Sequence, residues 1–125
     1  MLDASDPSHP SCRELLESHR GPLFVPLLCV TEVAQLASSR LGASAEASFL
    51  TDLFSGELSV MAVEPNEWPR IAELVWRYRD LPLGTVDASV VALAERLKVR
   101  QIATLDHRHF SVVKPAHVEA FELLP

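Results

Sequence analysis

The chain has 125 residues, of which 48% are hydrophobic, 22% charged and 6% aromatic, and its formal net charge is −6. This length suits one domain with a single core, and the apolar content excludes an intrinsically disordered segment. No apolar run reaches the roughly 20 residues that cross a bilayer, and the first residues do not form an export signal. The two cysteines lack the spacing of a metal site or a disulfide scaffold, so a reduced, cytoplasmic protein is expected.

Short apolar runs alternate with amphipathic stretches, which predicts βα units and a parallel sheet with helices on both faces. In chain order the predicted elements are a helix to about residue 19, a strand at 23–25, helices at 27–40 and 44–56, a strand at 58–63, helices at 65–78 and 86–97, and strands at 101–105 and 121–124. Gly42 and Gly56 are the expected stops of two helices, and Thr85 is the expected cap of helix 86–97.

Three carboxylates stand where packing alone does not require them. Glu32 has mostly apolar neighbours three and four positions away on its helix, so partial desolvation is expected, with a solvated edge position as the alternative. Asp87 lies in the first turn of a hydrophobic helix, where the helix dipole alone would favour it. Asp106 directly follows strand 101–105, either at the edge of the sheet where ligands bind or simply opening a turn.

If these three carboxylates converge, their repulsion requires a cation. Mg²⁺ prefers oxygen ligands and keeps several waters, which leaves room for a phosphate oxygen. The five histidines are scattered and do not form a zinc site. His107 and His109 flank Arg108 just after Asp106, and solvated loop positions are expected for them, with a catalytic role as the alternative.

The run from Ile102 to Phe110, IATLDHRHF, resembles the strand-and-turn signature near the end of PIN domains, particularly toxins of the VapC type. The sequence around Asp87 is similar to the third acidic position of that family, and the sequence around Glu32 is similar to the second. The segment from Asp3 to His9 is similar to the loop before the family's first helix, so the resemblance covers essentially the whole chain.

The resemblance implies a PIN-like three-layer α/β/α fold with a small parallel sheet, in a single domain over residues 1–125. It implies that Glu32, Asp87 and Asp106 are catalytic residues that bind Mg²⁺ or Mn²⁺. Thr104 would support them with a hydroxyl that positions the cluster or a metal-bound water. It also implies endoribonuclease activity, an RNA substrate, a homodimer without membrane attachment, and neutralisation by a cognate antitoxin.

The start of the chain departs from the family pattern. PIN domains carry their first acid at the end of an opening central strand, and that strand would already be over at Met1. Asp3 and Asp6 match the later loop and do not replace the acid. Either the chain is N-terminally shortened by about ten residues, the length of a strand and a turn, or the protein has lost a strand and a ligand. The first explanation is favoured because the other acids are present.

The sequence therefore predicts metal-assisted hydrolysis of RNA phosphodiester bonds by the toxin of a type II toxin–antitoxin system. Basic residues that could border an RNA path are Arg77, Arg79, Arg108 and Lys114. Trp68, Trp76 and Tyr78 have helical spacing, and core or dimer contacts are expected for them. The alternative is an acidic pocket that only docks a basic partner peptide without catalysis. A receiver-like phosphoacceptor domain is disfavoured because no lysine stands at the end of the third strand.

Overall fold

The structure is a computed structural model that describes residues 23–56, 58–104 and 107–124. These residues belong to two compact units, unit 1 (residues 1–62) and unit 2 (residues 63–125), which are taken in turn. The predicted helix up to about residue 19 and Asp106 lie outside the described residues. None of the helices described combines the length and apolar character needed to span a membrane.

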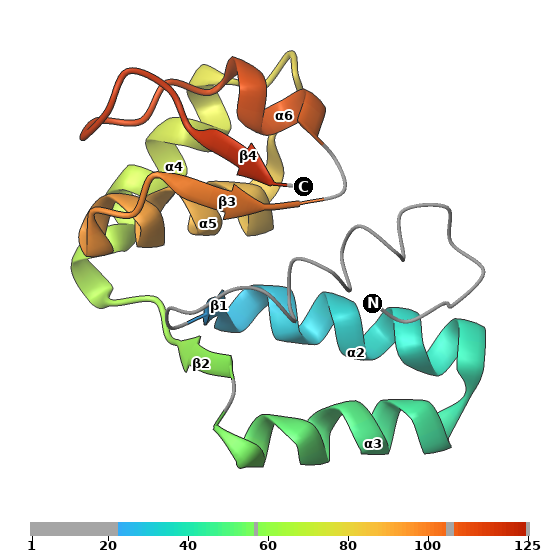
Figure 1. The fold of residues 1–125 in the computed structure, drawn as a ribbon. Helices are drawn as coiled ribbons and strands as arrows, with labels where there is room; N and C mark the ends of the chain where they lie inside the picture. The colour runs from blue at the N-terminus through green and yellow to red at the C-terminus, as the bar shows by residue number, and fades with distance from the viewer. Residues whose placement is uncertain (1–22, 57, 105–106, 125) are drawn as a thin grey trace. The chain divides into compact units, whose positions relative to one another are not determined.

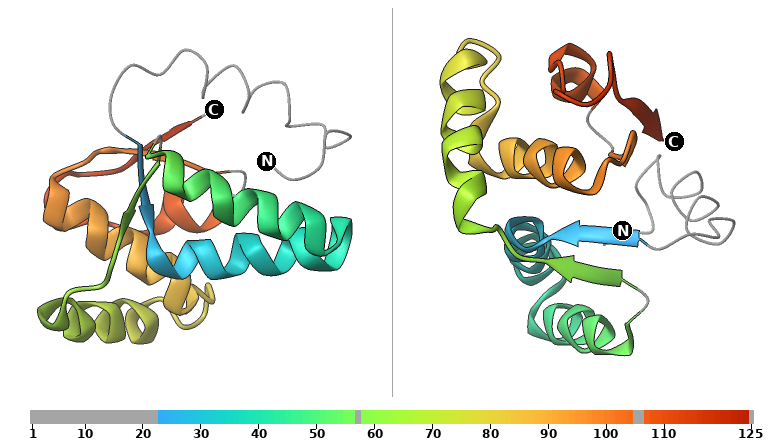
Figure 2. Two further views of the ribbon diagram at one scale, coloured as in Figure 1. Left: turned by 90° about the horizontal axis from the view of Figure 1, so that it is seen from below. Right: turned by 90° about the vertical axis from the view of Figure 1, so that its left-hand side faces the viewer.

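Unit 1 is a pair of parallel strands connected by two helices (Figure 1). Its elements are β1 (Leu23–Pro26), α2 (Leu27–Leu41), α3 (Ala43–Asp52), the short 3₁₀ helix η1 (Leu53–Ser55) and β2 (Leu58–Met61). Val25 of β1 pairs with Val60 of β2, and the two arrows point the same way in the right-hand view of Figure 2. The parallel pairing expected from sequence is confirmed in this unit.

Glycines end the helical segments of unit 1 as predicted. Gly42 follows α2 with φ 92°, and its N–H donates to the carbonyl of Ser38 at 3.0 Å. Gly56 follows η1 in the left-handed conformation, with φ 84° and ψ 3°. Residues with a Cβ rarely adopt such positive φ values, so these positions favour glycine and stop the helix.

Unit 2 contains a second parallel strand pair with helices around it. Its elements are the 3₁₀ helix η2 (Pro65–Glu67), α4 (Trp68–Arg77), α5 (Gly84–Leu97), β3 (Gln101–Ala103), α6 (His107–Val112) and β4 (Glu122–Leu124). Ile102 of β3 pairs with Leu123 of β4. The described residues thus form two sheets of two strands, one in each unit, where the sequence predicted one small sheet.

Two local predictions in unit 2 were wrong. Helix α5 begins at Gly84, so Thr85 lies inside its first turn and does not cap it. The segment after residue 106 was expected to be a loop, but residues 107–112 form helix α6, in which Phe110 is buried. A six-residue helix is not stable by its own propensity, so its packing against unit 2 accounts for it.

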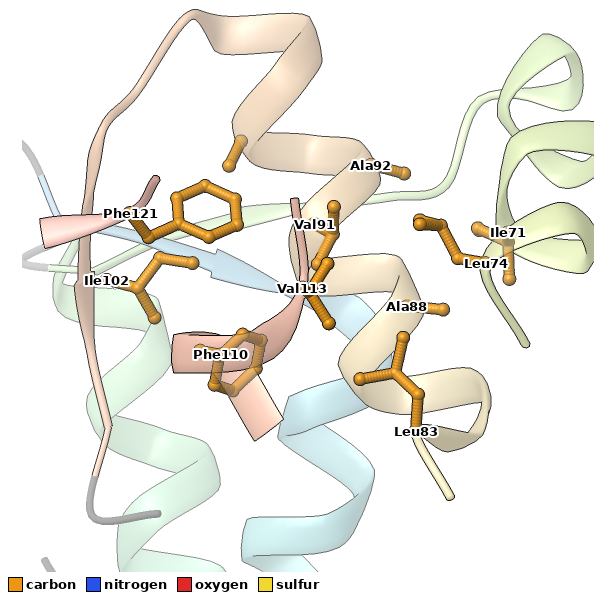
Figure 3. Packing of buried hydrophobic residues seen from close by; sticks show 11 residues of the cluster. Ile71, Leu74, Leu83, Ala88, Val91, Ala92, Ile102, Phe110, Val113 and Phe121 are labelled. Carbon is orange, nitrogen blue, oxygen red and sulfur yellow. The ribbon is translucent and has the colours of Figure 1, made fainter. Parts of the chain in front are cut away.

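The core of unit 2 surrounds α5 (Figure 3). Six residues of this helix are buried, Ala88, Ser89, Val91, Ala92, Leu93 and Ala94, so more than one of its faces is covered. Leu74 of α4, Ile102 of β3 and Phe110 of α6 pack in the same cluster. The buried hydroxyl of Ser89 donates to the carbonyl of Val86 at 2.6 Å, which satisfies it within the helix.

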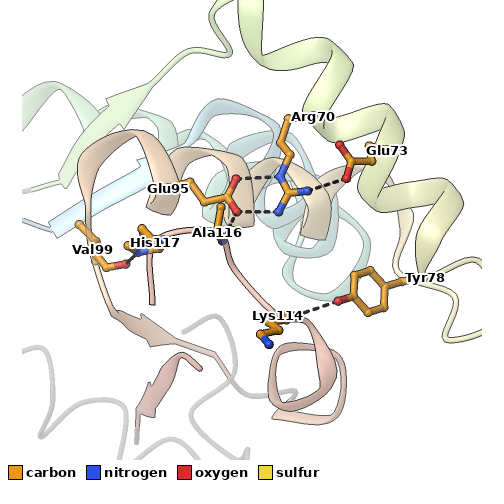
Figure 4. A network of polar contacts seen from close by, with 8 residues as sticks. All are labelled: Arg70, Glu73, Tyr78, Glu95, Val99, Lys114, Ala116 and His117. Carbon is orange, nitrogen blue, oxygen red and sulfur yellow. Dashed lines mark hydrogen bonds and ion pairs between the residues drawn. The ribbon is translucent and has the colours of Figure 1, made fainter. Parts of the chain in front are cut away.

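A polar network ties α4, α5 and the segment before β4 together (Figure 4). Arg70 donates to both carboxylate oxygens of Glu95, from Nε at 2.9 Å and from Nη2 at 2.7 Å. The N–H of Ala116 donates to Oε2 of Glu95 at 2.7 Å. Burial alone would raise the pKa of Glu95, but the hydrogen bonds from Arg70 and Ala116 outweigh it, and the pKa lies below its ordinary value of 4.5.

This network predicts a stability that depends on acid pH. Because the pKa of Glu95 is lower in the folded protein, its contribution is complete above the ordinary pKa and is lost as the pH falls through the folded pKa. Replacing Glu95 by Gln should lower the free energy of unfolding by about 1–3 kcal/mol at neutral pH and flatten its fall in acid. Urea unfolding across the pH range measures both effects.

Glu73→Gln is the matched control, because the Glu73 side chain is 58% exposed and contacts Arg70 through one oxygen at 3.1 Å. An exposed pair of this kind contributes at most about 1 kcal/mol. If Glu95→Gln and the wild type lose stability in parallel as the pH falls, the assigned role of Glu95 is wrong.

Candidate functional site

Asp87 occupies the first turn of α5 and is held by a histidine from α6. Its Oδ2 lies 2.8 Å from Nδ1 of His109, and the side chains are 32% and 14% exposed respectively. A carboxylate can only accept hydrogen bonds, so Nδ1 of His109 must carry the proton in this contact. Asp87 therefore combines a position at the positive end of a helix dipole with a fixed orientation of its carboxylate.

The same contact places the beginning of α6 beside the beginning of α5. Helix α6 follows β3 closely in the chain, and Thr104 at the carboxyl end of β3 donates its N–H to the carbonyl of Leu124 at 2.8 Å. Both β3 and β4 point toward the side of unit 2 on which α6 lies (Figure 1). The half-buried Thr104 and Asp87 thus belong to elements that are tied together in unit 2.

Glu32 is exposed on α2, so the structure shows the solvated position that the sequence left open, and not the partly desolvated one. The buried residues of α2 are Val30 and Ala37. At about 100° per residue, Glu32 points roughly 200° away from Val30, toward the opposite side of the helix. Its apolar neighbour Leu36 is itself 43% exposed. The neighbours of Glu32 three and four positions away are mostly apolar, but the buried residues of α2 are not among them.

The predicted convergence of the three acids stays a prediction. Glu32 lies in unit 1 and Asp87 in unit 2, and Asp106 lies outside the described residues. Within residues 23–56, 58–104 and 107–124, no three side chains of His, Cys, Asp or Glu gather as a metal site.

His109 is the functional candidate that sequence reasoning placed in a solvated loop. The structure separates the two histidines, since His107 is exposed whereas His109 is half-buried against Asp87. The available signal was Phe110, a large apolar residue that anchors the segment in the core and carries the adjacent His109 toward α5. Because helix α6 was not predicted, the burial of Phe110 did not indicate whether His107 or His109 would face α5.

Of the core or dimer contacts expected for Trp68, Trp76 and Tyr78, the structure tests the core contacts, and it finds one only for Tyr78. Trp68 is 48% exposed and Trp76 is 68% exposed, so neither is a core residue of unit 2. Tyr78 packs against the core, and its hydroxyl accepts a hydrogen bond from the N–H of Lys114 at 3.0 Å. This bond brings the end of α4 to the segment that follows α6.

Comparison with known proteins agrees with this architecture. Residues 1–115 match the PIN domain family. The chain is 34% identical over 124 residues to ribonuclease VapC26 of Mycobacterium tuberculosis (strain ATCC 25618 / H37Rv), a match that covers 99% of this chain and 92% of that protein. It also resembles the crystal structure of VapC20 of Mycobacterium tuberculosis, a sarcin–ricin loop cleaving toxin. There the TM-score is 0.73 and the identity 19%, over 79% of this chain and 76% of that one.

The chain therefore belongs to the PIN-domain family. The resemblance to the VapC type noted in its sequence is confirmed by these two relatives. The similarity to VapC20 concerns the fold, and it confirms the PIN-like α/β class predicted from the sequence.

The contact between Asp87 and His109 predicts the tautomer of that histidine. Two-bond ¹H–¹⁵N correlation spectra of the ¹⁵N-labelled protein at mildly alkaline pH should show His109 with its proton on Nδ1, because Asp87 accepts that proton. The exposed His107 is the internal control and should show the usual preference for Nε2. Asp87→Ala should return His109 to that preference. A wild-type His109 protonated on Nε2 would show that the hydrogen bond to Asp87 does not form.

Proposed function

We propose that the chain is a divalent-metal-dependent endoribonuclease that acts as the toxin of a type II toxin–antitoxin system. The observation that carries the proposal is the carboxylate of Asp87 in the first turn of α5, which His109 of α6 orients. Helix α6 follows the end of β3 closely in the chain. Asp87 stands at a position that resembles an acidic position of the PIN family. The relative VapC26, which is named a ribonuclease, supports the reaction class.

The donor set fits a hard cation such as Mg²⁺ or Mn²⁺. We assign Glu32, Asp87 and Asp106 as its ligands and Thr104 as a supporting hydroxyl, so that all donors are oxygen. His109 contacts Asp87 by hydrogen bonding to its carboxylate, which is how outer partners commonly orient metal-binding carboxylates. When bound, the cation offsets carboxylate repulsion, activates a water and stabilises charge on the phosphate oxygens.

In the proposed mechanism each residue of the site has a separate role. His109 keeps the carboxylate of Asp87 in one orientation, so that less conformational freedom is lost when a ligand is bound. Glu32 is exposed, and its ionised form therefore avoids the cost of burial. Asp106 joins them from the short connection between Thr104 and α6. No serine, cysteine or other protein nucleophile is required in this mechanism.

The proposal extends to the partners of the protein. We infer a single domain over residues 1–125 that works in the cytoplasm as a homodimer and cleaves RNA. A cognate antitoxin would neutralise it by inserting a basic side chain into the acid cluster and displacing the metal. The named VapC relatives and the carboxylate chemistry of the site support this inference.

The first test is cleavage of a structured RNA by the wild-type protein and by Asp87→Asn, in Mg²⁺ or Mn²⁺ and in EDTA. Loss of an outer partner of a metal ligand typically costs 10- to 100-fold, so loss of the ligand itself should lower kcat by at least about 100-fold. EDTA should abolish cleavage by the wild type.

Asp52→Asn is the matched control, because Asp52 is an exposed acid at the end of α3 and its loss changes the net charge equally. This control should cleave as fast as the wild type. Equal rates for Asp87→Asn and the wild type would contradict the proposal. Binding of a basic peptide without any cleavage would instead favour an acidic pocket that only docks a partner.

A further inference from the structure

Trp76 is a large aromatic residue that the core of unit 2 does not use. The inward positions of α4 are taken by Ile71 and Leu74, which are 3% and 0% exposed. Trp76 follows Leu74 by two residues, or about 200° of helix rotation, and therefore faces outward. Its side chain is 68% exposed, which leaves most of an apolar indole in contact with water. Folding of the helix does not explain this residue.

An arginine is stacked on the exposed ring. The guanidinium carbon of Arg79 lies 4.1 Å from the ring centroid of Trp76. Nη1 of Arg79 also donates to the backbone carbonyl of Trp76 at 2.8 Å. The two contacts hold a planar cation against a planar aromatic ring, the kind of cation–π pair that also stacks on nucleobases.

Further positive charge lies beside this pair. Arg77 and Arg79 flank Tyr78, whose hydroxyl accepts the N–H of Lys114 at 3.0 Å (Figure 4). Arg77, Arg79 and Lys114 are all exposed, and Asp80 is the adjacent exposed acid. Glu73, one turn earlier on α4, contacts Arg70. The local excess of positive charge contrasts with the net charge of −6 for the whole chain.

This set is connected to the segment that holds Asp87. Residues 107–114 contact the end of α4 through the bond between Lys114 and Tyr78, and they contact the start of α5 through the bond between His109 and Asp87. The N–H groups of Leu81 and Leu83 both donate to the carbonyl of Tyr78, which folds the connection between α4 and α5 tightly. The end of α4, residues 107–114 and the start of α5 are therefore joined by hydrogen bonds within unit 2.

We propose that Trp76, Arg77 and Arg79 form a platform that binds single-stranded RNA, with one unpaired base stacked on Trp76 and phosphates near the two arginines. The inference rests on the proposed ribonuclease function and adds a contact for its substrate. Proteins read single-stranded RNA by stacking bases on aromatic rings and arginine planes.

Binding in EDTA tests the platform without cleavage. Fluorescence anisotropy of a labelled single-stranded RNA of about 12 nucleotides should give a Kd that rises about 5- to 100-fold in Trp76→Ala. Trp76→Phe should restore most of the affinity. Trp68→Ala is the matched control, since Trp68 is an exposed tryptophan two turns earlier on the same helix, and it should stay within about twofold of the wild type. Thermal unfolding checks that each variant is folded.

A spectroscopic measurement reports stacking directly. The chain has two tryptophans, so Trp68→Phe leaves Trp76 as the single indole fluorophore. Its emission should be quenched when the same RNA is added in EDTA. Arg79→Ala should weaken binding and reduce the slope of log K against log salt by about one.

The outcomes separate this inference from the proposed activity. Unchanged RNA affinity in Trp76→Ala, unquenched Trp76 emission, or no RNA binding by the wild type would each overturn the platform. A Trp76→Ala defect confined to self-association or to antitoxin binding would also overturn it and identify a protein interface. If RNA binding depends on Trp76 but no cleavage occurs in Mg²⁺ or Mn²⁺, the platform stands and the proposed activity fails.

Discussion

The hydrogen bond between Asp87 and His109 is the contact on which the arrangement of the proposed site in unit 2 depends. It orients one carboxylate, and it fixes the short helix α6 beside the start of α5. Phe110, the next residue, buries its ring in the core, so packing and polar contact act on the same turn of α6. Thr104 is held by a backbone hydrogen bond to Leu124, and α6 is held by the contact of His109 with Asp87.

The proposed function requires a chain with a net charge of −6 to bind RNA, which is itself negatively charged. The distribution of charge in unit 2 shows how this repulsion is reduced locally. Arg70 is committed to Glu95 and Glu73, where it stabilises the packing of α4 on α5. Arg79, just after α4, stacks on the exposed ring of Trp76 instead, and the exposed Arg77 is the next residue after Trp76. In the proposed account, carboxylates bind the metal ion that hydrolysis requires, and a separate cationic and aromatic surface binds the RNA. Short-range contacts then outweigh the unfavourable net charge, which salt screens beyond about 10 Å.

Local patterns predicted much of the fold but less of the site. The ends of helices at glycines and the positions of short strands depend on residues that are adjacent in the chain. Both could therefore be predicted from the sequence. The start of α5 was missed because Thr85 has the chemistry of a cap, while Gly84 carries the positive φ at the actual start. Helix α6 depends on Phe110 reaching the core, a tertiary contact. The sequence left open whether Glu32 is desolvated or solvated, because its neighbours do not show which face of α2 is buried.

The central claim is that three carboxylates distant in sequence share one hard cation. A crystal structure of the protein soaked in Mn²⁺, with an anomalous difference map, tests it most directly. The account predicts one strong anomalous peak among the carboxylates of Glu32, Asp87 and Asp106, each bound to it directly, at about 2 Å, or through one water. A peak bound by other residues, or Glu32 and Asp87 too far apart to share an ion, would contradict it.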